Sequence, residues 1–196
     1  MRTPEAGDRI GLMFSLLDTD GDGVVEPSDL DLMHRRLTAA LPRAREAARA
    51  RLAAAIRRYR QALVGRPGGS GGSGGPGGPG GPGGPGDGDG RIGPEEFRAV
   101  VFAPEWFDTV GDEYAEAVAG FADPDGDRWV DRPDFVAVLT GIGFALPNVQ
   151  AMFDALGPVD GDRVEVRVWA RAIRDYYRPD TAGIAGDRLL PNETVR

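Results

Sequence analysis

A stripe of apolar residues recurs three and four positions apart near the start of the chain, from Ile10 to Leu17. Residues at this spacing share one face of an α-helix, and Pro4 stands where a first helical turn is tolerated. The pattern therefore predicts a helix over residues 4–17. A short and strongly polar stretch follows it.

The same helical spacing returns along the rest of the chain, and polar segments separate the helices. The chain is therefore expected to be an all-α protein. The further predictions are an exit helix from Pro27 toward Leu41, a helix from Pro42 with Ala48, Leu52, Ile56, Tyr59 and Leu63 on one face, a helix over 105–122 with Phe107, Val110, Tyr114, Ala117, Val118 and Phe121 on its core side, an exit helix carrying Phe135, Val138 and Leu139, and a last unit from Pro147.

The first polar loop, residues 18–29, reads DTDGDGVVEPSD. Carboxylates stand at positions one, three, five and twelve of this loop, and glycine stands at position six, which is the spacing of a calcium-binding EF-hand loop. A hard cation needs about six to eight oxygens, and the glycine allows the left-handed turn. The alternative is a solvated acidic turn. The predicted ligands are Asp18, Asp20, Asp22, the backbone carbonyl of Val24, Glu26 through a water, and Asp29.

A second loop of this kind, residues 123–134, reads DPDGDRWVDRPD. Arg128 replaces the usual glycine at position six, and a left-handed non-glycine residue costs about 1–2 kcal/mol. We expect five carboxylates around one ion to outweigh that cost. The predicted ligands are Asp123, Asp125, Asp127, the carbonyl of Trp129, Asp131 and Asp134.

Two other loops fit the register with damaged ligand sets. In residues 85–96 position one is Pro85, which has no side-chain oxygen, so the site is expected to be weak or absent; its remaining ligands would be Asp87, Asp89, Arg91 through its carbonyl, and Glu96. Ile92, at position eight, is expected to pair with Val25 of the first loop.

The loop at 157–168 has no carboxylate at positions one, three and twelve, so this hand is expected to be silent. Asp160 and Asp162 lie in it, but nothing closes a shell around them.

Composition limits the function. The net charge of −8 disfavours nucleic acid as the main partner, and the chain has no cysteine for a disulfide or thiolate site. We find no signal peptide and no membrane span, and expect a soluble cytoplasmic protein. Residues 35–66 carry ten arginines and one acid, a charge of +9, so the rest carries −17. This basic helix is interpreted as a solvated face; the alternative is contact with an acidic membrane or a protein groove.

The expected organisation is hand one and the entering helix of hand two at 1–64, a flexible, disordered Gly/Pro-rich linker at 65–86, the degenerate second loop and its exit helix at 87–103, hands three and four at 104–178, and a tail at 179–196 that could fold back over the core.

Four hands of uneven quality resemble the sarcoplasmic calcium-binding proteins and the bacterial calerythrins, and the first loop carries the resemblance most specifically. The resemblance implies a compact protein of four EF-hand (helix-loop-helix) units in two paired lobes, which binds Ca²⁺. Aspartate instead of the usual glutamate at position twelve of both loops predicts Mg²⁺ as a competitor. We expect a monomeric calcium buffer. The alternative is a calcium-switched sensor that binds a protein partner, which four methionines in the whole chain disfavour. No nucleophile-plus-base pattern indicates an enzyme, and the single histidine, His34, is interpreted as a surface residue.

Overall fold

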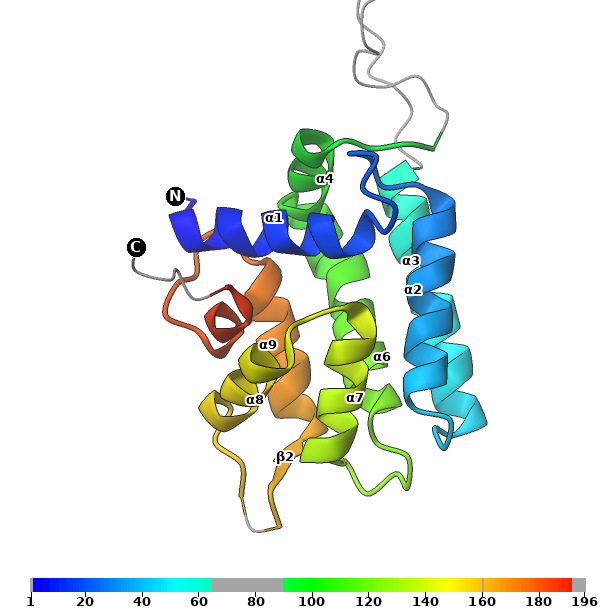
Figure 1. Cartoon of the computed structure of the whole chain (residues 1–196), viewed down its shortest axis with the longest axis vertical. Coiled ribbons are helices and arrows are strands. Elements are labelled where there is room, and N and C mark those ends of the chain that lie inside the picture. The colour runs from blue at the N-terminus through cyan, green and yellow to red at the C-terminus, as the bar shows by residue number, and fades with distance from the viewer. Residues whose placement is uncertain (1, 65–89, 160, 192–196) are drawn as a thin grey trace, which may run out of the picture.

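The computed structural model describes residues 2–64, 90–159 and 161–191 (Figure 1). The Gly/Pro-rich tract 65–86 lies outside these ranges, and so do Asp87, Asp89 and Asp160. The predictions that concern them therefore stay predictions.

The described chain is an all-α structure of helix–loop–helix units, as predicted. Thr3 caps the first helix, since its Oγ1 accepts a hydrogen bond from the Ala6 amide at 3.2 Å. The elements are α1 (Pro4–Leu17), α2 (Pro27–Ala40), α3 (Glu46–Val64), α4 (Pro94–Val101), α5 (Pro104–Trp106), the π-helical turn η1 (Phe107–Gly111), α6 (Asp112–Phe121), β1 (Trp129–Asp131), α7 (Arg132–Ile142), α8 (Leu146–Ala155), β2 (Arg163–Glu165), α9 (Val166–Tyr177) and the 3₁₀ turn η2 (Ala185–Leu189).

The loops meet in pairs through short antiparallel contacts at position eight. The expected pairing of Val25 with Ile92 is confirmed: their amide–carbonyl distances are 2.9 and 3.1 Å. In the second pair Val130 lies opposite Val164 in the β1–β2 ladder. Both contacts support the register assigned to the two damaged loops.

The predicted helix start at Pro42 is wrong, because α3 begins only at Glu46. Pro42 instead occupies the second position of a turn in which the Ala44 amide donates to the Leu41 carbonyl at 3.1 Å. Leu41 and Ala44 are buried, and the side chain of Arg49 donates to the Ala44 carbonyl at 3.0 Å. These contacts hold residues 41–45 as an ordered linker between α2 and α3. The apolar face predicted for the helix is buried, from Ala48 to Leu63.

The predicted helix over 105–122 is interrupted by the π turn η1. A π turn adds one residue to the helical repeat and rotates the residues before it. Trp106 is therefore buried, packing edge-on against Tyr59, while Phe107 and Val110 are only partly buried. From Tyr114 onward the predicted core side is correct.

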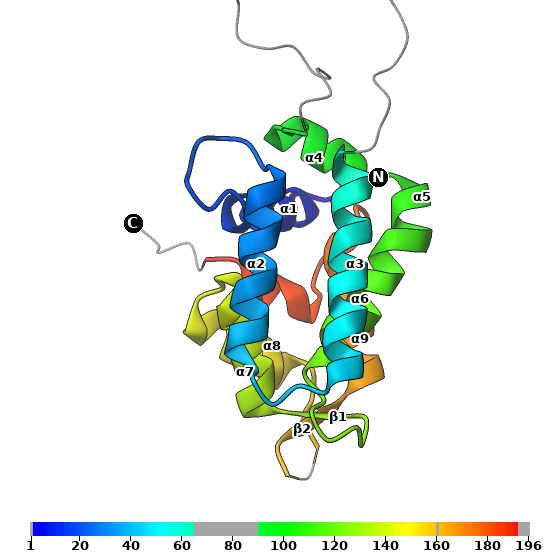
Figure 2. The ribbon, with the colours of Figure 1, turned by 90° about the vertical axis from the view of Figure 1, so that its right-hand side faces the viewer.

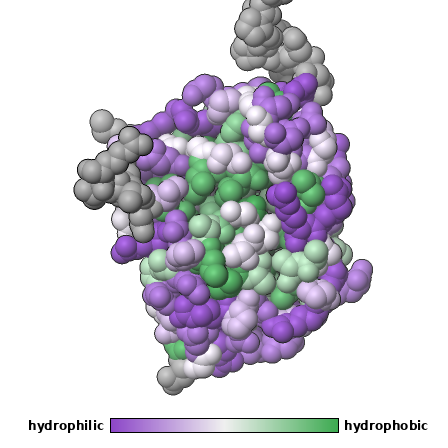
Figure 3. Space-filling model, in the orientation of Figure 1, coloured by the Kyte–Doolittle hydropathy of each residue, from purple (hydrophilic) through white to green (hydrophobic). Residues whose placement is uncertain are grey.

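The lobes share one continuous hydrophobic core. Helix α6 lies between α3 and α9 and packs on both, while α1 crosses one end of the molecule and α2 packs on α7 (Figures 1 and 2). Hydrophobic side chains also gather on one open face, in the area bounded by α1, α2 and α7, framed by hydrophilic ones (Figure 3). None of the helices in the described ranges is long and apolar enough to cross a membrane.

The segment after α9 folds back over the core and is fixed to α1 by Arg9. The guanidinium of this fully buried arginine pairs with Asp187 at 2.5 Å and donates to the carbonyls of Tyr176, Arg178 and Thr181 at 2.8–3.1 Å. A buried charge needs such a complete set of partners. The contacts place the tail, with buried Leu189, against the first helix.

Candidate metal centres

The first loop brings three of its predicted ligands together. Asp18, Asp20 and Asp22 each offer a carboxylate oxygen within 4.8 Å of the others. Asp18 accepts hydrogen bonds from the amides of Gly21 and Gly23 at 2.9 and 3.0 Å. Both glycines have positive φ, so the loop turns sharply around this carboxylate.

Asp29, at position twelve, closes the first loop from α2. It is buried (4 % exposed) and accepts from the Thr19 amide and hydroxyl at 3.2 and 2.6 Å and from the Glu26 amide at 3.0 Å. It thereby ties the start of the loop to its end. Val24 directly precedes the Val25 bridge.

The loop at 123–134 has the same construction. Asp123, Asp125 and Asp127 offer oxygens within 4.8 Å of one another, and Asp123 accepts from the amides of Gly126 and Arg128 at 2.7 and 3.2 Å. The two amides belong to positions four and six of the loop, as do the amides of Gly21 and Gly23 that donate to Asp18 in the first loop. Arg128 has φ 72°, so the left-handed arginine predicted from the sequence is present.

Ligand positions three, five, seven, nine and twelve of this loop line one cavity of about 450 Å³. The amide of Asp127 donates to Asp125, which lowers the pKa of the Asp125 carboxyl. Trp129 and Asp131 begin and end β1, and Asp134 is buried at the start of α7. The loop therefore presents several oxygen ligands to a common space.

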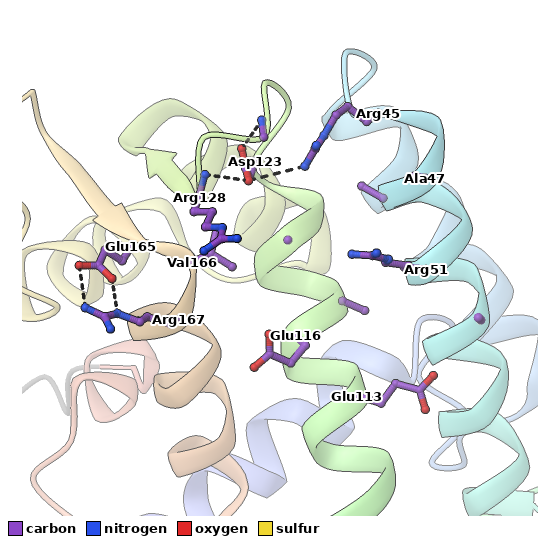
Figure 4. Close-up of a pocket in the computed structure, with 15 residues that line it drawn as sticks. Arg45, Ala47, Arg51, Glu113, Glu116, Asp123, Arg128, Glu165, Val166 and Arg167 are labelled. Atoms are coloured by element: carbon purple, nitrogen blue, oxygen red, sulfur yellow. Dashed lines mark hydrogen bonds and ion pairs between the residues drawn. The ribbon is translucent and has the colours of Figure 1, made fainter.

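Arginines from outside the loops pair with these carboxylates. In the third loop, Arg43 of the α2–α3 linker pairs with Asp134, and Arg45 pairs with Asp123 at 3.6 Å (Figure 4). In each pair of hands an arginine at position seven of the damaged loop also contacts position five of its partner. Arg91 reaches Asp22 at 2.6 Å, and Arg163 reaches Asp127 at 3.3 Å.

The second and fourth loops form no comparable cluster among the described residues. Gly90 has φ 80°, as its position six requires, and Glu96 lies half-buried in α4. In the fourth loop Asp162 pairs with Arg132 at 2.5 Å, and this hydrogen bond lowers the pKa of the Asp162 carboxyl. That carboxylate is thus bound by an arginine of hand three.

The arginine partners were not identified from the sequence. The excess of positive charge in residues 35–66 is the available signal for Arg43 and Arg45, but a solvated face gives the same pattern. Arg43 and Asp134 are 91 positions apart in the sequence. The spacing of residues within one helix or loop cannot indicate a contact between positions so far apart.

The sequence pattern of the EF hand matches residues 10–34 and 86–101, which contain much of the first two loops. No curated protein matches this chain. The matched segments span less than half of the chain. They do not include the loops at 123–134 and 157–168, for which the comparison with solved structures is needed.

Several solved structures share the fold. A Streptomyces coelicolor calcium-binding protein is 23% identical, with 90% of this chain and 99% of that chain covered and a TM-score of 0.64. The Ca²⁺-regulated photoprotein mitrocomin of the jellyfish Mitrocoma cellularia is 13% identical (96% and 92% covered, TM-score 0.69), and the coelenterazine-binding protein of Renilla muelleri is 15% identical (95% and 97%, TM-score 0.57). The chain has the EF-hand fold of the calcium-binding proteins.

Proposed function

We propose that this protein binds calcium at two sites, the loops 18–29 and 123–134. The observation that carries the proposal is the pair of matching carboxylate clusters, each built on the same backbone hydrogen bonds from positions four and six. Hard cations take such oxygen ligands. The ions would be held by Asp18, Asp20, Asp22, Val24, Glu26 and Asp29, and by Asp123, Asp125, Asp127, Trp129, Asp131 and Asp134.

Calcium titration by calorimetry tests the proposal. Wild type should bind two equivalents, and Asp18→Ala and Asp123→Ala should each lose one. Asp8→Ala is the matched control, because Asp8 is exposed on α1 outside both loops. A stoichiometry of zero, or two equivalents in both loop variants, would overturn the assignment.

Within this function we favour a calcium buffer. Met13, Met33 and Met152 are all buried in the core, whereas sensors expose flexible methionines in a groove. A sensor is the second candidate, and the apolar area between α1, α2 and α7 in Figure 3 supports it. Binding of an apolar fluorescent dye should fall on addition of calcium to a buffer and rise in a sensor.

Storage of an organic ligand inside the apolar core is not favoured, although one protein of similar fold is named for coelenterazine. The apolar cavity lined by Met13, Tyr114, Trp169 and Tyr176 has a volume of only about 40 Å³. Pockets for organic ligands usually measure about 300–1,000 Å³.

A further inference from the structure

The linker 41–45 joins α2 to α3 in the first lobe, and its arginines contact the third loop. Its turn is anchored by buried Leu41 and Ala44, and α2 leads into it along α7. At Gly141 of α7 a Cβ would lie 3.0 Å from Ala40, so the two helices approach closely just before the linker begins. This packing sets Arg43 and Arg45 over residues 123–134.

The two arginines contact the first and last ligand positions of the loop. Asp134 and Asp123 are buried (3 % and 4 % exposed), whereas the side chains of Arg43 and Arg45 are 60 % and 50 % exposed. Arg45 lies against the loop backbone, because a Cβ on Gly126 would be 2.3 Å from its Nη1. Figure 4 shows Arg45 pointing from the α3 side toward Asp123.

Arg43 lines the same cavity as the ligand positions three, five, seven, nine and twelve. Its hydrogen bond to Asp134 and the charges of Asp134, Asp131 and Asp125 raise the pKa of the guanidinium. The guanidinium is thus a cation held among the carboxylates that a metal ion requires. A buried carboxylate needs hydrogen-bond donors or a positive partner, and one oxygen cannot face an arginine and an ion equally well.

We infer that Arg43 and Arg45 are tethered competitors of the metal ion at the third loop, and that an ion binding there displaces their guanidinium groups from Asp134 and Asp123. The inference rests on the proposed calcium binding. The arginines lower the metal affinity of this loop and stabilise the protein when no ion is bound. Within the described ranges no arginine of a linker pairs with Asp29 of the first loop, which is held by Thr19 and Glu26 of the loop itself.

The competition predicts two effects of opposite sign for the variants Arg43→Ala and Arg45→Ala. Calcium should bind the third loop about tenfold more tightly, because a charge-assisted, half-exposed contact is removed. The melting temperature should fall in chelator and stay unchanged in saturating calcium. A merely structural arginine would lower the melting temperature in both conditions.

The experiment measures calcium titrations in the Asp18→Ala background, where only the third loop is left, together with melting in chelator and in calcium. Arg35→Ala is the matched control, because Arg35 is exposed on α2 away from the linker, and Arg43→Lys should retain most of the competition. Unchanged affinity in both alanine variants, or equal destabilisation in both conditions, would overturn the inference. No calcium binding in the Asp18→Ala background would instead overturn the proposed function of this loop.

Discussion

Arg163 at position seven of the fourth loop donates to Asp127 at position five of the third, with 3.3 Å between Nη1 and Oδ2. Arg91 contacts Asp22 in the equivalent way at 2.6 Å. In both pairs, the hand with the damaged ligand set therefore supplies a positive charge to the intact loop. Because this contact neutralises a predicted metal ligand, we expect the damaged hand to lower the metal affinity of its partner.

Removing the position-seven arginine should strengthen metal binding in the partner loop only. We expect Arg163→Ala to tighten calcium at residues 123–134 by about two- to fivefold, and Arg91→Ala to do the same at residues 18–29, since exposed ion pairs contribute little. Calorimetric titration measures both. Arg167→Ala is the control, because Arg167 pairs with Glu165 outside the two intact loops. Tightening in the wrong loop would contradict the assignment.

Ion selectivity should follow the length of the side chain at position twelve. Asp29 and Asp134 are one methylene shorter than the glutamate of most calcium loops and should give one oxygen, which favours the smaller shell of magnesium. We expect Asp29→Glu and Asp134→Glu to raise calcium affinity and reduce magnesium competition. Terbium luminescence sensitised by Trp129 reports on the third loop. The argument fails if magnesium does not displace terbium, or if Asp134→Glu leaves the competition unchanged.

Arg128→Gly should stabilise the protein, because arginine is held at φ 72° with its side chain exposed. Glycine keeps the amide that donates to Asp123 and removes the strain, for a gain of up to about 1 kcal/mol in the free energy of unfolding. Urea denaturation in chelator measures it. Arg128→Ala retains a Cβ in the same conformation and should give no comparable gain; equal effects in the two variants would exclude strain as the cause.

The four tyrosines should limit stability at alkaline pH. Tyr59, Tyr114, Tyr176 and Tyr177 are buried, and burial raises the pKa of each phenol above its usual value. A raised folded-state pKa leaves stability intact below the unfolded-state pKa near 10 and reduces it above that pH, by about 1.4 kcal/mol per pH unit for each tyrosine. Tyrosinate absorbance should therefore rise together with loss of helical circular dichroism. Ionisation near pH 10 with full helicity would contradict this burial.

The helices and loops could be predicted from the sequence because their signals are local. The stripe ending at Leu17, the proline at the start of α2 and the left-handed Arg128 each follow from spacing within a few residues. The turn at Pro42 and the π turn before α6 do not follow from the sequence pattern, because a proline suits the first turn of a helix as well as the second position of a tight turn, and a π turn leaves the helical spacing on either side of it in place. The sequence also does not indicate which arginines face the carboxylates, because the paired residues are far apart in the chain.

Helix α2 carries a predicted metal ligand near one end and a proposed metal competitor just beyond the other. Asp29 lies in its first turn, and Arg43 follows its last residue, Ala40, by three positions. Fourteen residues form a rod about 21 Å long, so a tilt imposed at one loop would move the linker at the other. Such a tilt would link the two sites thermodynamically: whatever factor occupancy of the first loop imposed on the third, the third would impose on the first. A protein with one intact loop in each lobe would then respond to calcium as one unit, through a single helix.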